Sequence, residues 1–122
     1  MDHSPGFLKI VADAKIRVRE LSIEQARAWL KENPKVVLLD VREDSEWAAG
    51  HAMEARHLGK GVLERDLETM IPDVNTEIIM YCGGGYRSIL TCDAAQKMGY
   101  RGVHSLIGGF KAMKAAGWPM KS

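Results

Sequence analysis

The residues best suited to chemistry lie together in one short segment. Cys82 follows the apolar run Ile78–Tyr81, and residues 83–85 are all glycine. Glycine tolerates a positive φ, so such a loop can curl and aim several backbone N–H groups at one anion. Arg87 adds a permanent positive charge, and the helical pattern after it adds the positive end of a helix dipole. This pattern favours the thiolate form of Cys82, which is the nucleophilic form and which also suits a persulfide.

A structural role is the alternative for each cysteine. A free cysteine often packs as a small hydrophobe, and Cys82 could occupy a tight turn for that reason. Three glycines and an arginine, however, offer no packing advantage there. Cys92 lies about 6–9 Å along the predicted helix, which disfavours a disulfide with Cys82. We expect Cys92 to pack or to be partly exposed, with a redox role as the alternative.

Strand and helix patterns alternate along the chain. Apolar runs and period-two alternation predict strands at residues 16–21, 36–39, 77–81 and 103–106. Helical spacing, capping residues and glycine or proline stops predict helices at residues 5–13, 22–32, 44–49, 62–70, 86–98 and 108–118. In the helix 86–98, Leu90, Ala94 and Met98 share one face. This alternation is typical of an α/β sandwich around a mostly parallel sheet, whose catalytic residues lie beyond the carboxyl ends of the strands, as Cys82 does.

The composition narrows the class of protein. The chain has 122 residues, of which 46% are hydrophobic and 27% charged, and this predicts one packed domain. Seventeen basic and sixteen acidic residues give a net charge of +1, so neither nucleic acid nor a membrane surface is an expected partner. No run approaches the roughly 20 apolar residues of a membrane span, and we expect no signal peptide. The two cysteines match no metal pattern, so we expect a cytoplasmic protein with neither metal nor cofactor.

Four motifs, in order, resemble the rhodanese family between about Val18 and Trp118. They are Leu38–Arg42, similar to the family's strand ending in Asp-Val-Arg; Glu46-Trp47 with Gly50-His51, similar to its Glu-aromatic and Gly-His element; Tyr81–Ser88, similar to its active-site loop; and Gly108-Gly109 with Trp118, similar to its C-terminal signature. The chain departs from the family after His51. The family usually continues with an apolar residue, proline and Gly-Ala, whereas residues 52–56 here are Ala-Met-Glu-Ala-Arg.

The resemblance implies a fold and a domain layout. The fold is a three-layer α/β sandwich with a mostly parallel five-stranded sheet and helices on both faces. One domain then spans residues 1–122, with residues 1–15 as a short N-terminal helical extension.

The resemblance also implies a thiosulfate sulfurtransferase that works in two steps. The Cys82 thiolate attacks the outer sulfur of a donor such as thiosulfate and releases sulfite, and a thiol or cyanide then removes the sulfur from the Cys82 persulfide. The residues expected to hold the charged intermediate are Gly83, Gly84, Gly85, Tyr86 and Arg87. Arg87 either pairs with an anionic donor or braces the loop against an acidic residue, and Tyr86 lines the rim.

Other residues receive supporting roles. Asp40 and Arg42 follow the neighbouring strand and are expected either to support the site or to form a structural ion pair. We expect His51, rather than acting as a general base, to cap or hydrogen-bond; His104 is the other histidine considered as a base. Trp118 is expected in the core. Specificity is expected from Tyr86, Arg56, Lys60 or a partner's surface.

Two alternatives to a sulfurtransferase stay open. The first is a phosphatase or arsenate reductase of the cell-cycle phosphatase type, whose loop has five residues between cysteine and arginine where this chain has four between Cys82 and Arg87. The shorter ring is tight for a phosphate but suits one added sulfur, and a motif needs its structural context. The second is a binding module that has lost catalysis, which the presence of Cys82 disfavours. A sulfur-relay protein, with another protein as partner, lies between these interpretations.

Overall fold

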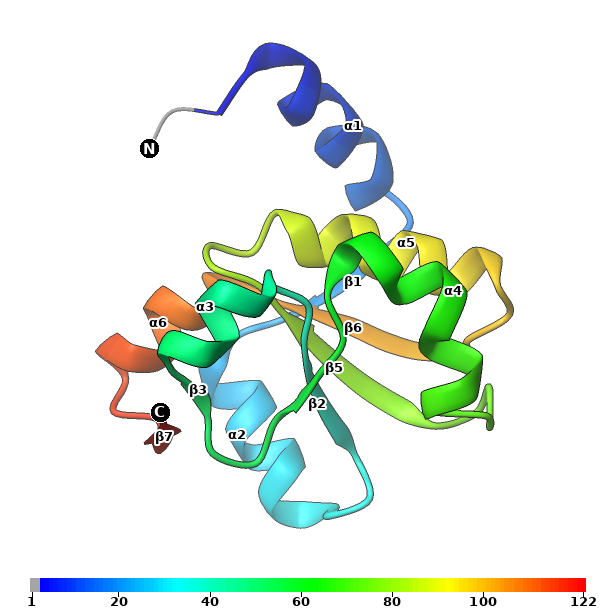
Figure 1. The fold of residues 1–122 in the computed structure, drawn as a ribbon. Coiled ribbons are helices and arrows are strands. Elements are labelled where there is room, and N and C mark those ends of the chain that lie inside the picture. The colour runs from blue at the N-terminus through cyan, green and yellow to red at the C-terminus, as the bar shows by residue number, and fades with distance from the viewer. Residues whose placement is uncertain (1–2) are drawn as a thin grey trace.

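The computed structural model describes residues 3–122, which form a three-layer α/β sandwich (Figure 1). Its central sheet has five parallel strands in the order β1-β6-β5-β2-β4. The strands are β1 (Arg19–Leu21), β2 (Val37–Asp40), β4 (Arg56–His57), β5 (Glu77–Tyr81) and β6 (Gly102–Leu106). The predicted fold class, including the five-stranded sheet, is confirmed.

Helices cover both faces of this sheet (Figure 1). One face packs against α4 (Lys60–Met70) and α5 (Arg87–Lys97), which contribute Leu63, Leu67, Cys92 and Ala95 to its core. The other face packs against α2 (Ile23–Glu32) and α6 (Gly109–Ala115), which contribute Ala26 and Met113. The remaining elements are α1 (Pro5–Lys15), α3 (Asp44–Ala49) and a small antiparallel pair, β3 (His51–Ala52) with β7 (Met120–Lys121). Among residues 3–122, no helix is long and apolar enough to cross a membrane.

Local signals placed most elements close to where the structure has them. The α2 helix begins with the predicted capping box, in which Gln25 N–H donates to Ser22 Oγ at 3.1 Å and Ser22 N–H donates to Gln25 Oε1 at 2.9 Å. The α1 helix runs two residues beyond its predicted end at residue 13, because Val11 and Ala14 are both buried in a small apolar cluster with Ile89. Ser4 precedes this helix, but its side chain makes no capping hydrogen bond.

The buried face of α5 differs from the face singled out in the sequence. Leu90, Ala94 and Met98 are only half-buried. The fully buried positions are Ser88, Ile89, Thr91, Cys92, Asp93 and Ala95. The helix lies between the sheet and α1, so it needs two buried sides rather than one stripe. Leu90 and Met98 pack at the edges of buried clusters and are themselves partly buried.

Candidate active site

Cys82 follows β5 at its carboxyl end, where the chain turns from the sheet into α5. Its side chain is buried, with 1% of the residue exposed, and it lies at the base of a cleft of about 670 Å³. Residues that line this cleft around Cys82 include Phe7, Glu46, Gly84, Tyr86, Arg87 and Lys111. The structure therefore brings the predicted loop residues together with side chains from α1, α3 and α6.

Two backbone N–H donors and one serine hydroxyl converge on the sulfur of Cys82. The N–H of Gly85 lies 3.1 Å from Sγ, and the N–H of Ser88 lies 3.4 Å from it. The Ser88 hydroxyl lies 3.6 Å from Sγ and 2.7 Å from the hydroxyl of Ser105, and both serines are fully buried. In the thiolate state of Cys82, the Ser88 hydroxyl can donate to the sulfur while Ser105 donates to Ser88. A buried anionic sulfur thus has hydrogen-bond donors on its protein side.

These donors act on Sγ of the unloaded cysteine, and the backbone N–H groups among them come from Gly85 and Ser88. The amides of residues 83–87 were predicted to hold the charged intermediate, and that role stays a prediction. Ser88 belongs to the quoted Tyr81–Ser88 motif, yet its role was not predicted. Ser105 has no local signal, because only the parallel pairing of β5 and β6 brings it near Ser88.

Two glycines hold the loop in its shape. Gly85 has φ +98°, and a Cβ there would lie 3.0 Å from Gly108 N, so both backbone and space favour glycine. Gly109 has φ +55°, and a Cβ there would overlap the carbonyl oxygen of Cys82 and lie 2.9 Å from the carbonyl carbon of Gly83. Gly84 has neither constraint, since no atom lies within 4 Å of its Cβ position. The constraint on the loop therefore lies at Gly85 and Gly109.

Backbone hydrogen bonds join the loop to the first turn of α6. Phe110 N–H donates to Cys82 O at 2.7 Å, and Lys111 N–H donates to Gly83 O at 3.1 Å. These bonds satisfy carbonyl groups that a tight loop would otherwise leave without donors. The Gly-Gly pair at the start of α6 is thus a support for the Cys82 loop.

Arg87 braces the loop against α3. Its Nη1 lies 2.7 Å from Glu46 Oε1 and its Nη2 lies 3.0 Å from Glu46 Oε2, a paired arrangement that fixes both side chains. The hydrogen bonds from Arg87 lower the pKa of Glu46 from 4.5 to about 2. Two roles were predicted for Arg87, and in the structure it braces the loop against an acidic residue, Glu46. Glu46 was quoted as part of a motif, but its partner could not be read from the sequence.

Asp40 and Arg42 form a buried ion pair outside the cleft. Arg42 Nη2 lies 2.8 Å from Asp40 Oδ2 and 2.6 Å from Gly50 O. The Arg42 guanidinium also lies 4.0 Å from the ring centroid of Phe110, the residue whose N–H binds the carbonyl of Cys82. Asp40 and Arg42 therefore form a structural ion pair, which was one of the two predicted roles. The pair is linked to the Cys82 loop through the ring of Phe110.

His51, His104 and Trp118 have structural contacts outside the Cys82 cleft. His51 Nδ1 lies 3.0 Å from Trp47 O, and its ring stacks on Trp47 with centroids 3.4 Å apart, as expected for a hydrogen-bonding residue. His104 lines a different hollow, next to Trp29, and does not line the cleft. Trp118 is buried, as predicted.

Cys92 is a core residue. It is fully buried among apolar side chains, and this burial raises the pKa of its thiol well above the usual range. Cys92 therefore packs in the core, as the first expectation had it, and the alternative of partial exposure was wrong.

Of the three residues named for specificity, Tyr86 lines the cleft, whereas Arg56 and Lys60 do not.

Several cleft residues, Ser4 among them, were missed by the sequence analysis. Lys111 lines the cleft, and the ion pairs among residues 3–122 do not include it. The sequence feature that could have indicated Lys111 is its position two residues after Gly109 of the C-terminal Gly-Gly motif. His3 and Phe7 line the cleft from the N-terminal segment, which carries no chemical motif. Among residues 3–122, no cluster of three or more His, Cys, Asp or Glu side chains could hold a metal ion.

Known proteins are similar to this chain in sequence and in fold. The thiosulfate sulfurtransferase GlpE of Coxiella burnetii is 31% identical over 94 residues, which are 76% of this chain and 86% of that protein. A Rhodopseudomonas palustris protein of unknown function, described as a possible tyrosine phosphatase, has a TM-score of 0.87 at 26% identity, with 99% of this chain and 98% of that chain covered. The polysulfide-sulfur transferase of Wolinella succinogenes has a TM-score of 0.80 at 26% identity, with 95% and 87% covered. Residues 22–116 match the family described as the rhodanese-like domain, and the chain belongs to that family.

Proposed function

We propose that this chain transfers a sulfane sulfur from a donor such as thiosulfate to a thiol or cyanide, through a persulfide on Cys82. The observation that carries the proposal is the convergence of two N–H groups and the Ser88 hydroxyl on Cys82 Sγ at the base of a cleft. Donors aimed at a sulfur stabilise its anionic form, which both the free thiolate and the persulfide require. The names of the GlpE and Wolinella relatives support the same class of reaction.

The first step loads Cys82. The thiolate attacks the outer sulfur of thiosulfate, a new S–S bond forms, and the S–S bond of thiosulfate breaks as sulfite leaves with its electron pair. Lys111 lines the cleft and carries the cation that can attract the sulfonate end of the donor. Arg87 is held by Glu46, so its contribution is to position the loop.

The second step unloads Cys82. An acceptor thiolate or cyanide attacks the terminal sulfur, and the electron pair of the breaking S–S bond returns to Sγ. The N–H groups of Gly85 and Ser88 stabilise the departing thiolate, so no general acid is needed to protonate it. Cys82 is therefore the nucleophile of the first step and the leaving group of the second.

A phosphatase is the second candidate function, because the Rhodopseudomonas palustris neighbour is described as a possible tyrosine phosphatase. Phosphate binding in a loop of this kind would require the arginine side chain to face the anion. Here both terminal nitrogens of Arg87 bond to Glu46, and four residues separate Cys82 from Arg87 where the phosphatase loop has five. Both features favour sulfur transfer.

Steady-state assays separate the two functions. Purified protein is given thiosulfate and cyanide, with thiocyanate as the measured product, and in parallel an aryl phosphate, with phosphate release as the measured product. We expect thiocyanate formation that Cys82→Ser abolishes, and no phosphate release above that of Cys82→Ser. Phosphate release by the wild type that Cys82→Ser abolishes, without thiocyanate formation, would replace the proposal with a phosphatase.

A further inference from the structure

One wall of the Cys82 cleft comes from outside the matched family region. The family match begins at residue 22, whereas α1 ends at Lys15. His3 and Phe7 nevertheless line the cleft together with Tyr86. Their rings gather closely: the centroid distances are 4.6 Å between His3 and Tyr86, 5.3 Å between His3 and Phe7, and 6.4 Å between Phe7 and Tyr86. We call these three residues the aromatic wall.

The helix that carries this wall is anchored to α5. Arg17, just after α1, bonds to Asp93 of α5 through Nε and Nη2, both at 2.9 Å. Gln96 of α5 donates to the carbonyl of Arg17 at 2.9 Å. Arg17 meets the later part of α5 and Phe7 meets Tyr86 at its start, so the segment that includes α1 contacts α5 near both ends. Figure 1 shows α1 on the side of α5 that faces away from the sheet. The wall is therefore fixed to the same helix that begins at the Cys82 loop.

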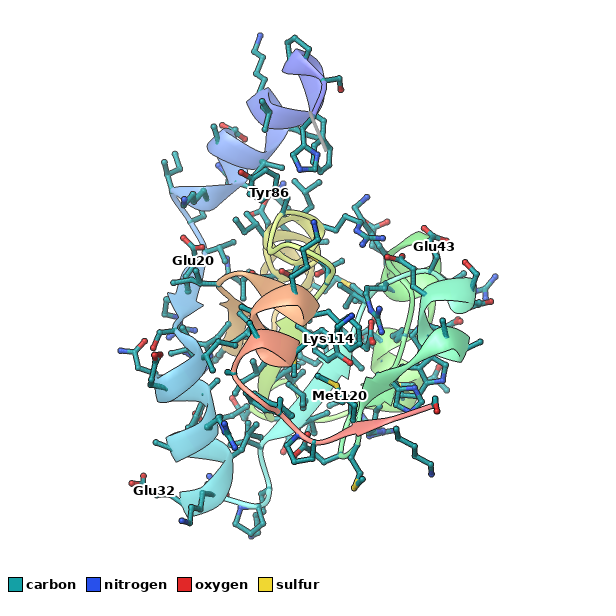
Figure 2. All side chains as sticks on the ribbon, turned by 90° about the vertical axis from the view of Figure 1, so that its left-hand side faces the viewer. Glu20, Glu32, Glu43, Tyr86, Lys114 and Met120 are labelled. Carbon is teal, nitrogen blue, oxygen red and sulfur yellow. The ribbon has the colours of Figure 1, made fainter. Side chains whose placement is uncertain are left out.

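The aromatic wall places a partly exposed apolar surface beside the reactive sulfur. Tyr86 is 39% exposed, and Figure 2 shows it between α1 and the start of α5. Phe7 is half-buried, so part of its ring is accessible from the cleft. An aromatic face of this kind stabilises contact with another aromatic or apolar group beyond simple area burial.

The cleft is also much larger than an inorganic donor. Thiosulfate has five heavy atoms, and at roughly 30 Å³ for each water-sized group it would fill roughly 150 Å³. The cleft measures about 670 Å³. A thiosulfate ion bound between Lys111 and the Cys82 loop would therefore not fill the part of the cleft beside the aromatic wall. A cavity of this size with an apolar wall and a few polar groups is the usual form of a site for an organic molecule.

We propose that the sulfur acceptor is an organic thiol with an aromatic or apolar body, which binds against the aromatic wall. This inference rests on the proposed function, since it names the acceptor class for the Cys82 persulfide. The acceptor thiolate attacks the terminal sulfur of Cys82–S–SH, the bond from that sulfur to Sγ breaks, and the products are the organic persulfide and the Cys82 thiolate. Atoms and charge balance without an added oxidant or reductant. His3 and Phe7 are positioning residues for the acceptor in this step.

The test measures how fast preloaded persulfide is removed by two thiols of similar acidity. Cys82 is loaded with thiosulfate, excess donor is removed, and the loss of one sulfur atom is followed by intact mass with benzyl mercaptan or with 2-mercaptoethanol. The quantity compared is the ratio of the two second-order rate constants, which cancels general changes in Cys82 reactivity. The variants are Phe7→Ala and His3→Ala, and Leu8→Ala is the matched control, because Leu8 lies on α1, is 41% exposed and does not line the cleft.

We expect the ratio to favour benzyl mercaptan in the wild type and to fall about tenfold in Phe7→Ala, which corresponds to about 1.4 kcal/mol. His3→Ala should lower the ratio in the same direction, and Leu8→Ala should keep it within twofold of the wild type. A ratio that is unchanged in Phe7→Ala and His3→Ala, or that falls equally in Leu8→Ala, overturns the acceptor assignment. Failure of the proposed function is a separate outcome, because thiosulfate would then not load Cys82 in the first place.

Discussion

Gly109 packs so closely against Cys82 that a Cβ on Gly109 would overlap the carbonyl oxygen of Cys82. That oxygen accepts a hydrogen bond from the next residue, Phe110, at 2.7 Å. The contact joins the first turn of α6 to the loop that carries the sulfur, although the two segments are far apart in the sequence. The shape of the Cys82 loop therefore depends on a glycine that lies outside it.

Gly109→Ala should disrupt the loop, whereas Gly84→Ala should be tolerated. At Gly109 the new methyl group meets backbone that cannot move without shifting Cys82, and the residue has φ +55°. Overpacking and a left-handed backbone together should lower the free energy of unfolding by about 2 kcal/mol. Urea denaturation checks the stability, and the rate of Cys82 alkylation at neutral pH checks the loop, which should react at least fivefold more slowly. Equal effects of the two substitutions would count against this contact as the constraint.

Ser88→Ala should slow the reaction of Cys82 without unfolding the protein. The substitution removes the hydroxyl that lies 3.6 Å from Sγ and leaves the hydroxyl of Ser105 without its partner. A hydrogen bond to a charged group contributes about 1.5–3 kcal/mol, so we expect alkylation and thiosulfate loading to slow by about tenfold. Ser45→Ala makes the same chemical change at an exposed position of α3 and is the control. Unchanged alkylation in Ser88→Ala would remove Ser88 from the set of sulfur donors.

Lys111→Gln should raise the KM for thiosulfate more than it lowers kcat. The substitution removes a positive charge from the cleft while keeping the length and polarity of the side chain similar. We expect KM to rise by about fivefold to tenfold and to depend less on salt, because screening weakens the attraction between Lys111 and the donor. Lys114→Gln is the matched control, since Lys114 is on the same helix but contacts the Phe110 ring instead. A KM that changes equally in both variants would mean that only net charge matters.

Glu46→Gln should lower stability in a pH-dependent way. Arg87 lowers the pKa of Glu46 from 4.5 to about 2, so the folded protein holds this proton less tightly than the unfolded chain does. The ion pair therefore stabilises the fold fully above about pH 4.5, and this stabilisation is lost as the pH falls toward 2. We expect Glu46→Gln to be less stable than the wild type by about 1 kcal/mol at pH 7, the upper end for a partly exposed pair.

Urea denaturation at several pH values measures this difference. The gap between the wild type and Glu46→Gln should shrink steadily below pH 4.5. Glu64→Gln, which removes an exposed carboxylate from the middle of α4 that takes no part in the ion pairs among residues 3–122, should show no such gap at pH 7. A gap that stays constant from pH 7 to pH 3 would show that Glu46 acts through packing instead of charge.

Local signals were enough to predict much of this fold. The capping box at Ser22 and Gln25 placed the start of α2, and the apolar run that ends at Tyr81 placed β5. Both signals are carried by neighbouring residues, so no knowledge of the tertiary structure was needed. The strands β3, β4 and β7 have two residues each, which is too short for any period to be visible. The segment 52–56, where the chain departs from the family pattern, ends at the first residue of β4.

The candidate site was predictable only in part. Cys82 and its loop were visible because their residue types are consecutive. The residues that contact the loop could not be predicted from the sequence. Glu46, Ser105 and Gly109 come close to it only because α3, β6 and α6 pack around it. The aromatic wall has the same origin: Phe7 meets Tyr86 only after α1 has packed along α5.

The intact mass of the protein after thiosulfate treatment tests the central claim most directly. Wild type and Cys92→Ser should each gain the mass of one sulfur atom, lose it again with cyanide, and differ little in rate, because Cys92 is buried in the core. Cys82→Ser should gain nothing while keeping its fold by circular dichroism. A gain of one sulfur atom by Cys82→Ser after thiosulfate treatment, or no gain by Cys92→Ser, would contradict the assignment of Cys82 as the sulfur carrier.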